Sequence, residues 1–170
     1  TRTVLADGKK PDTLAAYATR TPVVVFHPGD LSILSGGAAE RRTMLDRIAL
    51  FVDPVSADHR LRYSRAARAR QVVLDERGVA AQDLESLERL MAVHGAALGL
   101  ARAEAAARLM TALEPLFARM AAPELRFEAR FVPGGSFDAA ELERELSRRR
   151  VQDAKRRSAT YGPERDNLGV

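Results

Sequence analysis

The sequence predicts a mainly α-helical fold of about four helices, an α+β chain in which short β-strands lie at both ends. In the central part, apolar residues recur every three or four positions, which is the spacing of one helix face. Aromatic residues make up only 5% of the 170 residues, and there is no Trp. A core of Leu, Val, Met and Ala favours helix packing over a β-sandwich.

The N-terminal part predicts strand material around one short helix. Residues 3–5 are expected to form a strand that enters a tight turn at Asp7-Gly8, since Asp-Gly supplies the positive φ of hairpin turns. A short helix is expected over residues 14–18. Residues 21–26 (TPVVVF) predict a buried strand in the middle of a sheet, because the run is apolar, β-branched and too short for a helix.

Three helices are predicted next. The first follows the glycines at 36 and 37 and ends at Asp53-Pro54. The second covers residues 55–76, with Gly78 as its left-handed stop. The third begins near Asp83 as N-cap, and Pro115 predicts a kink or break in it. Its expected apolar stripe consists of Leu84, Leu87, Met91, His94, Leu98, Ala101 and Ala105.

The C-terminal part predicts a strand, a basic helix and the start of another strand. Residues 125–131 alternate apolar and charged side chains, which indicates a half-buried strand. A fourth helix is expected from Asp138 and becomes rich in Arg and Lys after Leu146. The apolar residue Leu168, after a turn, is typical of a strand that begins there.

Composition excludes several classes of site. With no Cys, the chain has no disulfide, thiolate zinc site or cysteine nucleophile. The three His residues lack metal-ligand spacing, and no Ser has a recognisable His and carboxylate around it, so we expect neither a metal nor a catalytic residue. No run of 18 apolar residues occurs, so we expect a soluble, cytoplasmic protein without membrane contact.

Arginine dominates the cations. Lys stands at three positions, so 24 of the 27 basic residues are Arg, in a chain of net charge +4. A GC-rich genome explains this bias, and guanidinium groups also suit phosphates and buried carboxylates. Residues 41–70 hold eight Arg against three Asp, and residues 148–157 hold six cations against one acid.

Two segments are dense in polar motif residues. In residues 26–46, Arg42 and Asp46 are four positions apart, which predicts an ion pair on a helix surface. Two further interpretations of these charges are phosphate binding and a structural role in which they pin the helix to a neighbouring strand. Residues 158–168 combine a Gly-Pro turn with charged residues ahead of the final strand.

On these residues the chain resembles the RecF family of bacterial recombination and repair ATPases. The two end motifs carry the resemblance: Gly36, Arg41, Arg42 and Asp46, then Gly162, Pro163, Arg165 and Asp166. Further matches occur in order along nearly the whole chain, at Tyr63, Arg70, Gly95, Arg102, Thr160 and Leu168. The chain departs from the family pattern at Gly29, Gln71, Glu164 and Asn167.

The resemblance implies a helical arm, or lid, of an ABC-type ATPase head. Residues 1–30 would be head-flanking strands, residues 31–157 the arm, and residues 158–170 a returning head strand. The parent would bind ATP and Mg, form a homodimer, associate with gapped DNA and work with RecR and RecO. This chain has no Gly-Lys-Ser/Thr loop, Walker B pair or signature loop, so we expect no ATP hydrolysis by it alone.

Site residues follow from the same resemblance and from charge. Asp30, in the turn that links a head strand to the arm, would sense magnesium or the γ-phosphate in the parent. The candidate DNA contacts are Arg41, Arg42, Arg70, Arg148, Arg149 and Arg150, which would bind duplex backbone without reading sequence. Two alternatives stay open: a non-catalytic module that binds a protein partner, and an unrelated basic helical DNA-binding protein.

Overall fold

A computed structural model describes residues 3–20, 22–120 and 124–169 and confirms the mainly α-helical fold. The three long helices are α3 (Ala38–Val52), α4 (Ser56–Arg77) and α5 (Asp83–Met120). The shorter ones are α1 (Leu14–Arg20), α2 (Ser32–Ser35), α6 (Ala139–Arg148) and α7 (Arg150–Arg156). Single 3₁₀ turns, η1 (Pro28–Leu31) and η2 (Pro163–Arg165), complete the helical elements.

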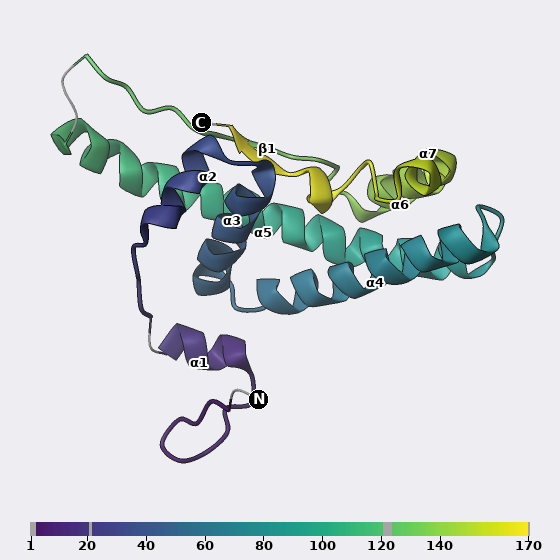
Figure 1. The fold of residues 1–170 in the computed structure, drawn as a ribbon, viewed down its shortest axis with the longest axis horizontal. Coiled ribbons are helices and arrows are strands. Elements are labelled where there is room, and N and C mark those ends of the chain that lie inside the picture. The colour runs from purple at the N-terminus through teal and green to yellow at the C-terminus, as the bar shows by residue number, and fades with distance from the viewer. Residues whose placement is uncertain (1–2, 21, 121–123, 170) are drawn as a thin grey trace.

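The long helix α5 is the axis of the molecule. Figure 1 shows α4 running antiparallel to one half of α5, with α3 beside the other half. Helices α6 and α7 lie over the half of α5 that packs against α4. Gly78 ends α4 with a φ of 78°, as the sequence predicts. The Asp138 side chain caps α6 by accepting a hydrogen bond from the Glu141 amide at 2.7 Å.

One small antiparallel sheet brings distant parts of the chain together. Strand β1 (Arg130–Val132) pairs with β2 (Asn167–Gly169), and Phe131 lies opposite Leu168. The predicted C-terminal strand is therefore confirmed, whereas the strand expected over residues 125–131 is reduced to its last two residues and Val132. This pairing anchors the final segment beside α3 and α5.

The core divides into two clusters along α5. One lies between α4, α5 and α6, around Tyr63, Met91, Leu98, Leu142 and Leu146. The other lies between α3, α5 and the sheet, around Leu45, Ala49, Ala105, Ala106 and Leu168. Alanine and leucine make up most of both clusters, in keeping with the low aromatic content.

The apolar stripe of α5 is displaced from the predicted one. Leu84, Met91, Leu98 and Ala105 are buried as expected. The predicted Leu87, His94 and Ala101 are only half-buried, however, and their neighbours Glu88, Gly95 and Arg102 are buried in their place. The prediction failed at these positions because it followed hydropathy, and a charge can occupy a core position when it is paired.

Pro115 does not break α5, which continues to Met120. A proline removes one backbone donor, here the one that would reach the carbonyl of Thr111. Thr111 is exposed, so water can satisfy that carbonyl. The expected break is therefore wrong.

The N-terminal strand predictions are also wrong for the described residues. Residues 3–5 form no strand, although Asp7 and Gly8 make the expected turn, with φ values of 52° and 75° and two hydrogen bonds between Ala6 and Lys9. Residues 22–26 are not a buried strand: Val24 is 97% exposed, and the segment runs alone before η1 (Figure 1). Thr21 lies outside the described residues. A strand needs a hydrogen-bonded neighbour, and this segment pairs with no described strand.

None of the helices among the described residues combines the length and apolar character that crossing a bilayer requires.

Candidate nucleic-acid interface and buried ion-pair clusters

The first motif cluster, here the Arg102 cluster, joins α3, α5 and the C-terminal segment. The Arg102 guanidinium donates two hydrogen bonds to the carboxylate of Asp46, at 2.7 and 3.0 Å. It also donates to the Asp166 carboxylate at 3.0 Å and to the Pro163 carbonyl at 2.7 Å. The second oxygen of Asp166 accepts the Gly134 amide at 2.8 Å. One arginine thus holds three segments that are far apart in sequence.

The electrostatics of this cluster follow from its burial. Burial acts to lower the pKa of Arg102, but hydrogen bonds and charge from Asp46 and Asp166 raise it overall. Burial raises the pKa of Asp166 despite its bonds to Gly134 and Arg102. Burying the ion pair between Arg102 and Asp166 therefore costs free energy of desolvation, and the main contribution of the pair is to fix how the helix and the C-terminal segment lie.

Arg42 and Asp46 do not form the predicted ion pair. Asp46 is used by Arg102, while Arg42 donates to the backbone carbonyl of Asp166 at 3.0 Å. Arg41 donates to the Asn167 side chain at 2.9 Å and to the Gly36 carbonyl at 2.9 Å. The structural interpretation is confirmed, because both arginines bind α3 to the segment that forms β2.

The remaining residues of the C-terminal motif shape one turn. Gly162 has a φ of 115°, and a Cβ there would lie 3.1 Å from the Tyr63 hydroxyl oxygen. Gly162 also donates its amide to the Gly134 carbonyl at 3.0 Å, and Arg165 donates to the Ala159 carbonyl at 2.9 Å. A side chain would strain this conformation, so glycine is required at position 162.

The second cluster, here the Arg70 cluster, lies between α4, α5 and α7. Arg70 is 1% exposed and donates to Glu88 at 3.0 Å, to Asp153 at 2.8 Å and to the Leu146 carbonyl at 2.7 Å. Arg150 adds two bonds to Glu88, at 2.9 and 2.6 Å. Two cations and two carboxylates therefore neutralise each other within the core.

This burial corrects one predicted DNA contact. Arg70 does not reach the surface, because all three of its partners lie inside the helical body. Arg150 is largely committed to Glu88, with 17% of its side chain exposed. By contrast, 71% of the Arg148 side chain and 28% of the Arg149 side chain are exposed, and both bond to Glu145.

Glu164 and Tyr63 form a third buried contact beside the Arg102 cluster. The Tyr63 hydroxyl donates to the Glu164 carboxylate at 2.9 Å. Burial raises the pKa of Glu164, and burial together with the Glu164 charge raises the pKa of Tyr63 well above its ordinary value. A carboxylate at this position is thus held by a tyrosine.

Asp30, the predicted cofactor residue, has a local role in the structure. Its carboxylate accepts the His27 amide at 2.8 Å, while the His27 ring accepts the Gly29 amide at 2.9 Å. These reciprocal bonds cap η1. Among the described residues, no group of three His, Asp or Glu side chains could hold a metal ion.

Glu88, Asp153 and the bonds of Arg102 have structural roles that the sequence pattern did not predict. The available signal was spacing: Glu88 and Arg102 lie four residues after Leu84 and Leu98, on the face that is buried. Charges on an apolar helix face call for partners, and those partners come from segments that only the fold brings close.

Comparison with known proteins gives the family to which these motifs point. The chain is 33% identical over 176 residues to the DNA replication and repair protein RecF of Anaeromyxobacter sp. strain Fw109-5, a match that covers 98% of this chain and 47% of the relative. It is 30% identical over 181 residues to RecF of Myxococcus xanthus, covering 100% of this chain and 48% of the relative. The resemblance to the RecF family is confirmed.

Solved RecF structures share the fold. A structure of the recombination mediator protein RecF with ATP, in the RecFOR pathway, matches with a TM-score of 0.79 at 20% identity, over 95% of this chain and 46% of that one. A second, described as RecF-ATPrS, matches with a TM-score of 0.83 at 21% identity. The chain spans about half the length of the RecF relatives it matches. No family model matches it.

Proposed function

We propose that this chain is the helical arm of a RecF-like DNA recombination and repair protein, and that its α6–α7 end contacts DNA. The RecF relatives that match 98% or more of the chain carry the proposal. In the proposed parent, an ATP-dependent cytoplasmic dimer binds gapped DNA and acts with RecR and RecO-like partners to load the recombinase.

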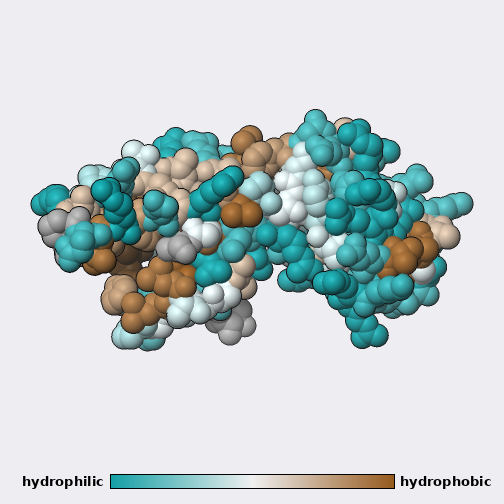
Figure 2. Space-filling view, turned by 90° about the horizontal axis from the view of Figure 1, so that it is seen from above, coloured by the Kyte–Doolittle hydropathy of each residue, from teal (hydrophilic) through white to brown (hydrophobic). Residues whose placement is uncertain are grey.

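The exposed basic residues support the placement of the DNA contact. Arg148, Arg149 and Lys155 surround a shallow hollow at the α6–α7 end. Figure 2 shows this end, at the right of the view, covered mostly by hydrophilic residues, while hydrophobic residues gather in the left-hand half. Exposed guanidinium and ammonium groups bind phosphate backbone without sequence readout. We call these three residues the α7 face.

Salt dependence of DNA binding tests this function. The variant Arg148→Gln/Lys155→Gln removes two charges from the α7 face but leaves the Arg70 cluster intact. On a gapped duplex, we expect the slope of log affinity against log salt to fall by about 1.8, since each lost contact removes about 0.9. Fluorescence anisotropy across a salt series measures it.

The control removes the same charge elsewhere. Lys9→Gln/Lys10→Gln alters two exposed residues near the N-terminus, far along the chain from the α7 face. Equal slopes for the two variants would refute the DNA contact at this face. Absence of binding by the wild-type chain at physiological salt would instead favour a protein-interaction module.

The role proposed for Asp30 is tested in an intact parent protein. We propose that the η1 turn, which joins the N-terminal segment to the arm, responds to bound ATP and magnesium. Asp30→Ala is expected to reduce ATP turnover and ATP-dependent dimerisation. Turnover and dimerisation equal to those of the wild type would remove this role.

A further inference from the structure

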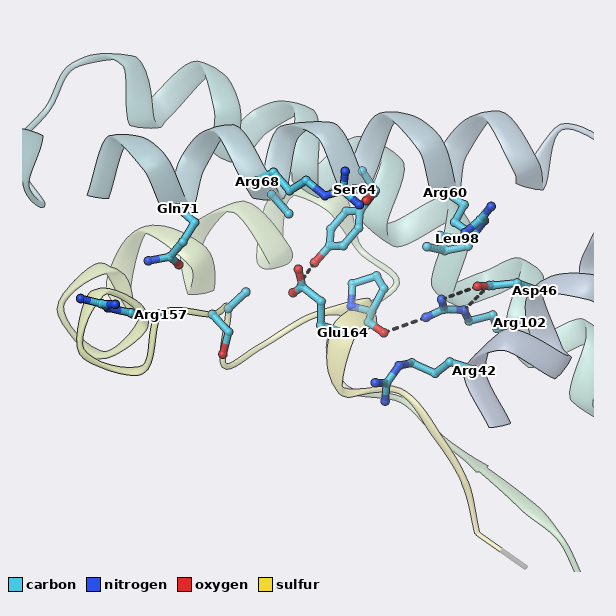
Figure 3. A pocket seen from close by; sticks show the side chains of 15 residues that line it. Arg42, Asp46, Arg60, Ser64, Arg68, Gln71, Leu98, Arg102, Arg157 and Glu164 are labelled. Carbon is cyan, nitrogen blue, oxygen red and sulfur yellow. Dashed lines mark hydrogen bonds and ion pairs between the residues drawn. The ribbon is translucent and has the colours of Figure 1, made fainter. Parts of the chain in front are cut away.

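A second basic feature is a cleft of about 410 Å³ whose lining includes the motif residues Arg42, Asp46 and Tyr63. One wall is α4, and the other is the segment from Arg157 to Glu164 (Figure 3). The Arg102 cluster closes one end. We call this the arginine cleft. Besides Arg102, its basic lining residues are Arg42, Arg60, Arg68 and Arg157.

The α4 wall presents polar groups at helical spacing. Arg60, Ser64 and Arg68 are four residues apart, so they lie on one face of the helix, and Figure 3 shows them along the same side of the cleft. Arg60 and Arg68 are exposed. With a rise of about 1.5 Å per residue, their Cα atoms lie about 12 Å apart along the helix.

The opposite wall contributes Arg157 from the turn after α7. Arg157 has a φ of 51°, a left-handed conformation that a residue with a Cβ adopts at a cost. It is exposed and lies opposite Gln71 in Figure 3. The cleft therefore has guanidinium groups on both walls.

The carboxylates of the cleft do not neutralise these arginines. Asp46 is bonded twice to Arg102, and Glu164 accepts the Tyr63 hydroxyl. Within residues 3–20, 22–120 and 124–169, no carboxylate forms an ion pair with the four arginines Arg42, Arg60, Arg68 and Arg157. Burial, followed by the nearby Arg102 charge, lowers the pKa of Arg42, while Asp166 and Asp46 act in the opposite direction.

We propose that the arginine cleft binds the phosphate groups of an extended phosphorylated ligand, either nucleic-acid backbone or a nucleotide polyphosphate. Guanidinium forks match phosphate oxygens in geometry and charge. A ligand that reaches both Arg60 and Arg68 must extend about 12 Å, which excludes a lone phosphate ion as the full occupant. Only the nucleic-acid form of this proposal rests on the proposed DNA function.

Binding by the 170-residue chain tests the cleft. The cleft variant is Arg60→Gln/Arg68→Gln, both in α4. The matched control is Arg65→Gln/Arg156→Gln, which removes one exposed charge from α4 and one from α7, outside the cleft lining. The probes are a short fluorescent oligothymidylate, ATP in EDTA and inorganic phosphate. Circular dichroism confirms that both variants keep the helical content of the wild type.

The expected result is that the cleft variant binds one of the two longer probes about tenfold or more weakly, while the control changes little. For the oligothymidylate, the salt slope should fall by about 1.4, because each single-strand contact contributes about 0.7. ATP binding that depends on the cleft, without DNA binding, would support the inference and refute the proposed DNA function.

Three results would overturn the inference. The first is that neither oligothymidylate nor ATP binds the wild-type chain at low salt. The second is that the cleft and control variants weaken binding equally. The third is that inorganic phosphate binds as tightly as the longer probes. If oligothymidylate binding responds to the α7 face variant but not to the cleft variant, the DNA function stands, and the cleft proposal then fails unless ATP binding depends on the cleft.

Discussion

Replacing Arg70 tests whether the Arg70 cluster holds α4, α5 and α7 together. Arg70→Met removes the guanidinium but keeps an unbranched apolar side chain, which is shorter than that of Arg. Glu88 and Asp153 would then remain buried, at 1% and 0% exposure, without the cation that joins them. Three hydrogen bonds are lost, to two carboxylates and to the Leu146 carbonyl.

The expected loss is about 3 kcal/mol in the free energy of unfolding. Breaking a buried ion pair by removing one partner costs about 3–5 kcal/mol. The lower end applies because the carboxylates keep other partners: Glu88 retains Arg150, and Asp153 retains the amide and hydroxyl of Thr160. A domain is stable by about 5–15 kcal/mol, so the variant should still fold.

Urea denaturation followed by circular dichroism measures this loss. The control is Arg148→Met, the same substitution at a side chain that is 71% exposed, where we expect a change of about 0.5 kcal/mol or less. If Arg70→Met is no more destabilising than Arg148→Met, the cluster does not hold these helices, and the argument from its buried charges is wrong.

Three further predictions concern the packing of α4 against its neighbours. Gly95→Ala would place a Cβ 2.9 Å from the Tyr63 ring and 3.0 Å from Leu142, so we expect a loss of about 1–2 kcal/mol in urea denaturation despite the better helix propensity of Ala; unchanged stability would contradict this packing. Burial, followed by the charge of His59, lowers the pKa of His94, whose Nδ1 lies 3.0 Å from that of His59. The unfolded chain therefore binds more protons below about pH 6.5, so stability should fall as the pH drops from 7.5 to 5.5, and His94→Gln should reduce that fall. Because the pKa of Tyr63 is raised in the folded state, the folded chain should show no Tyr63 ionisation in its 295 nm absorbance at pH values just above 10. The free energy of unfolding should decline above that pH, since Tyr63 ionises in the unfolded chain first. A Tyr63→Phe variant should therefore keep the absorbance titration of the folded wild type but show a weaker decline in stability at alkaline pH.

The sequence pattern predicted the structure correctly where interactions between residues close in sequence decide it. The helix that ends at Gly78 and the cap at Asp138 follow from conformational preferences and from side-chain hydrogen bonds within four residues. The motif residues Arg41, Arg42, Asp46 and Asp166 were also found in the sequence, and the structure brings them together. Their partners were not predictable, because the choice between Arg42 and Arg102 for Asp46 depends on where α5 lies relative to α3.

The sequence alone determined the helical class, most helix boundaries and the RecF resemblance, because these depend on spacing and residue type along the chain. Tertiary structure alone decided which charges are structural and which are available. Arg70 and Arg148 each lie in an arginine-rich stretch of the sequence, and the sequence pattern does not separate their roles. In the structure, Arg70 is buried between Glu88 and Asp153, while Arg148 faces solvent. A buried charge is stable only with a partner, and those partners come from helices up to 83 residues away along the chain.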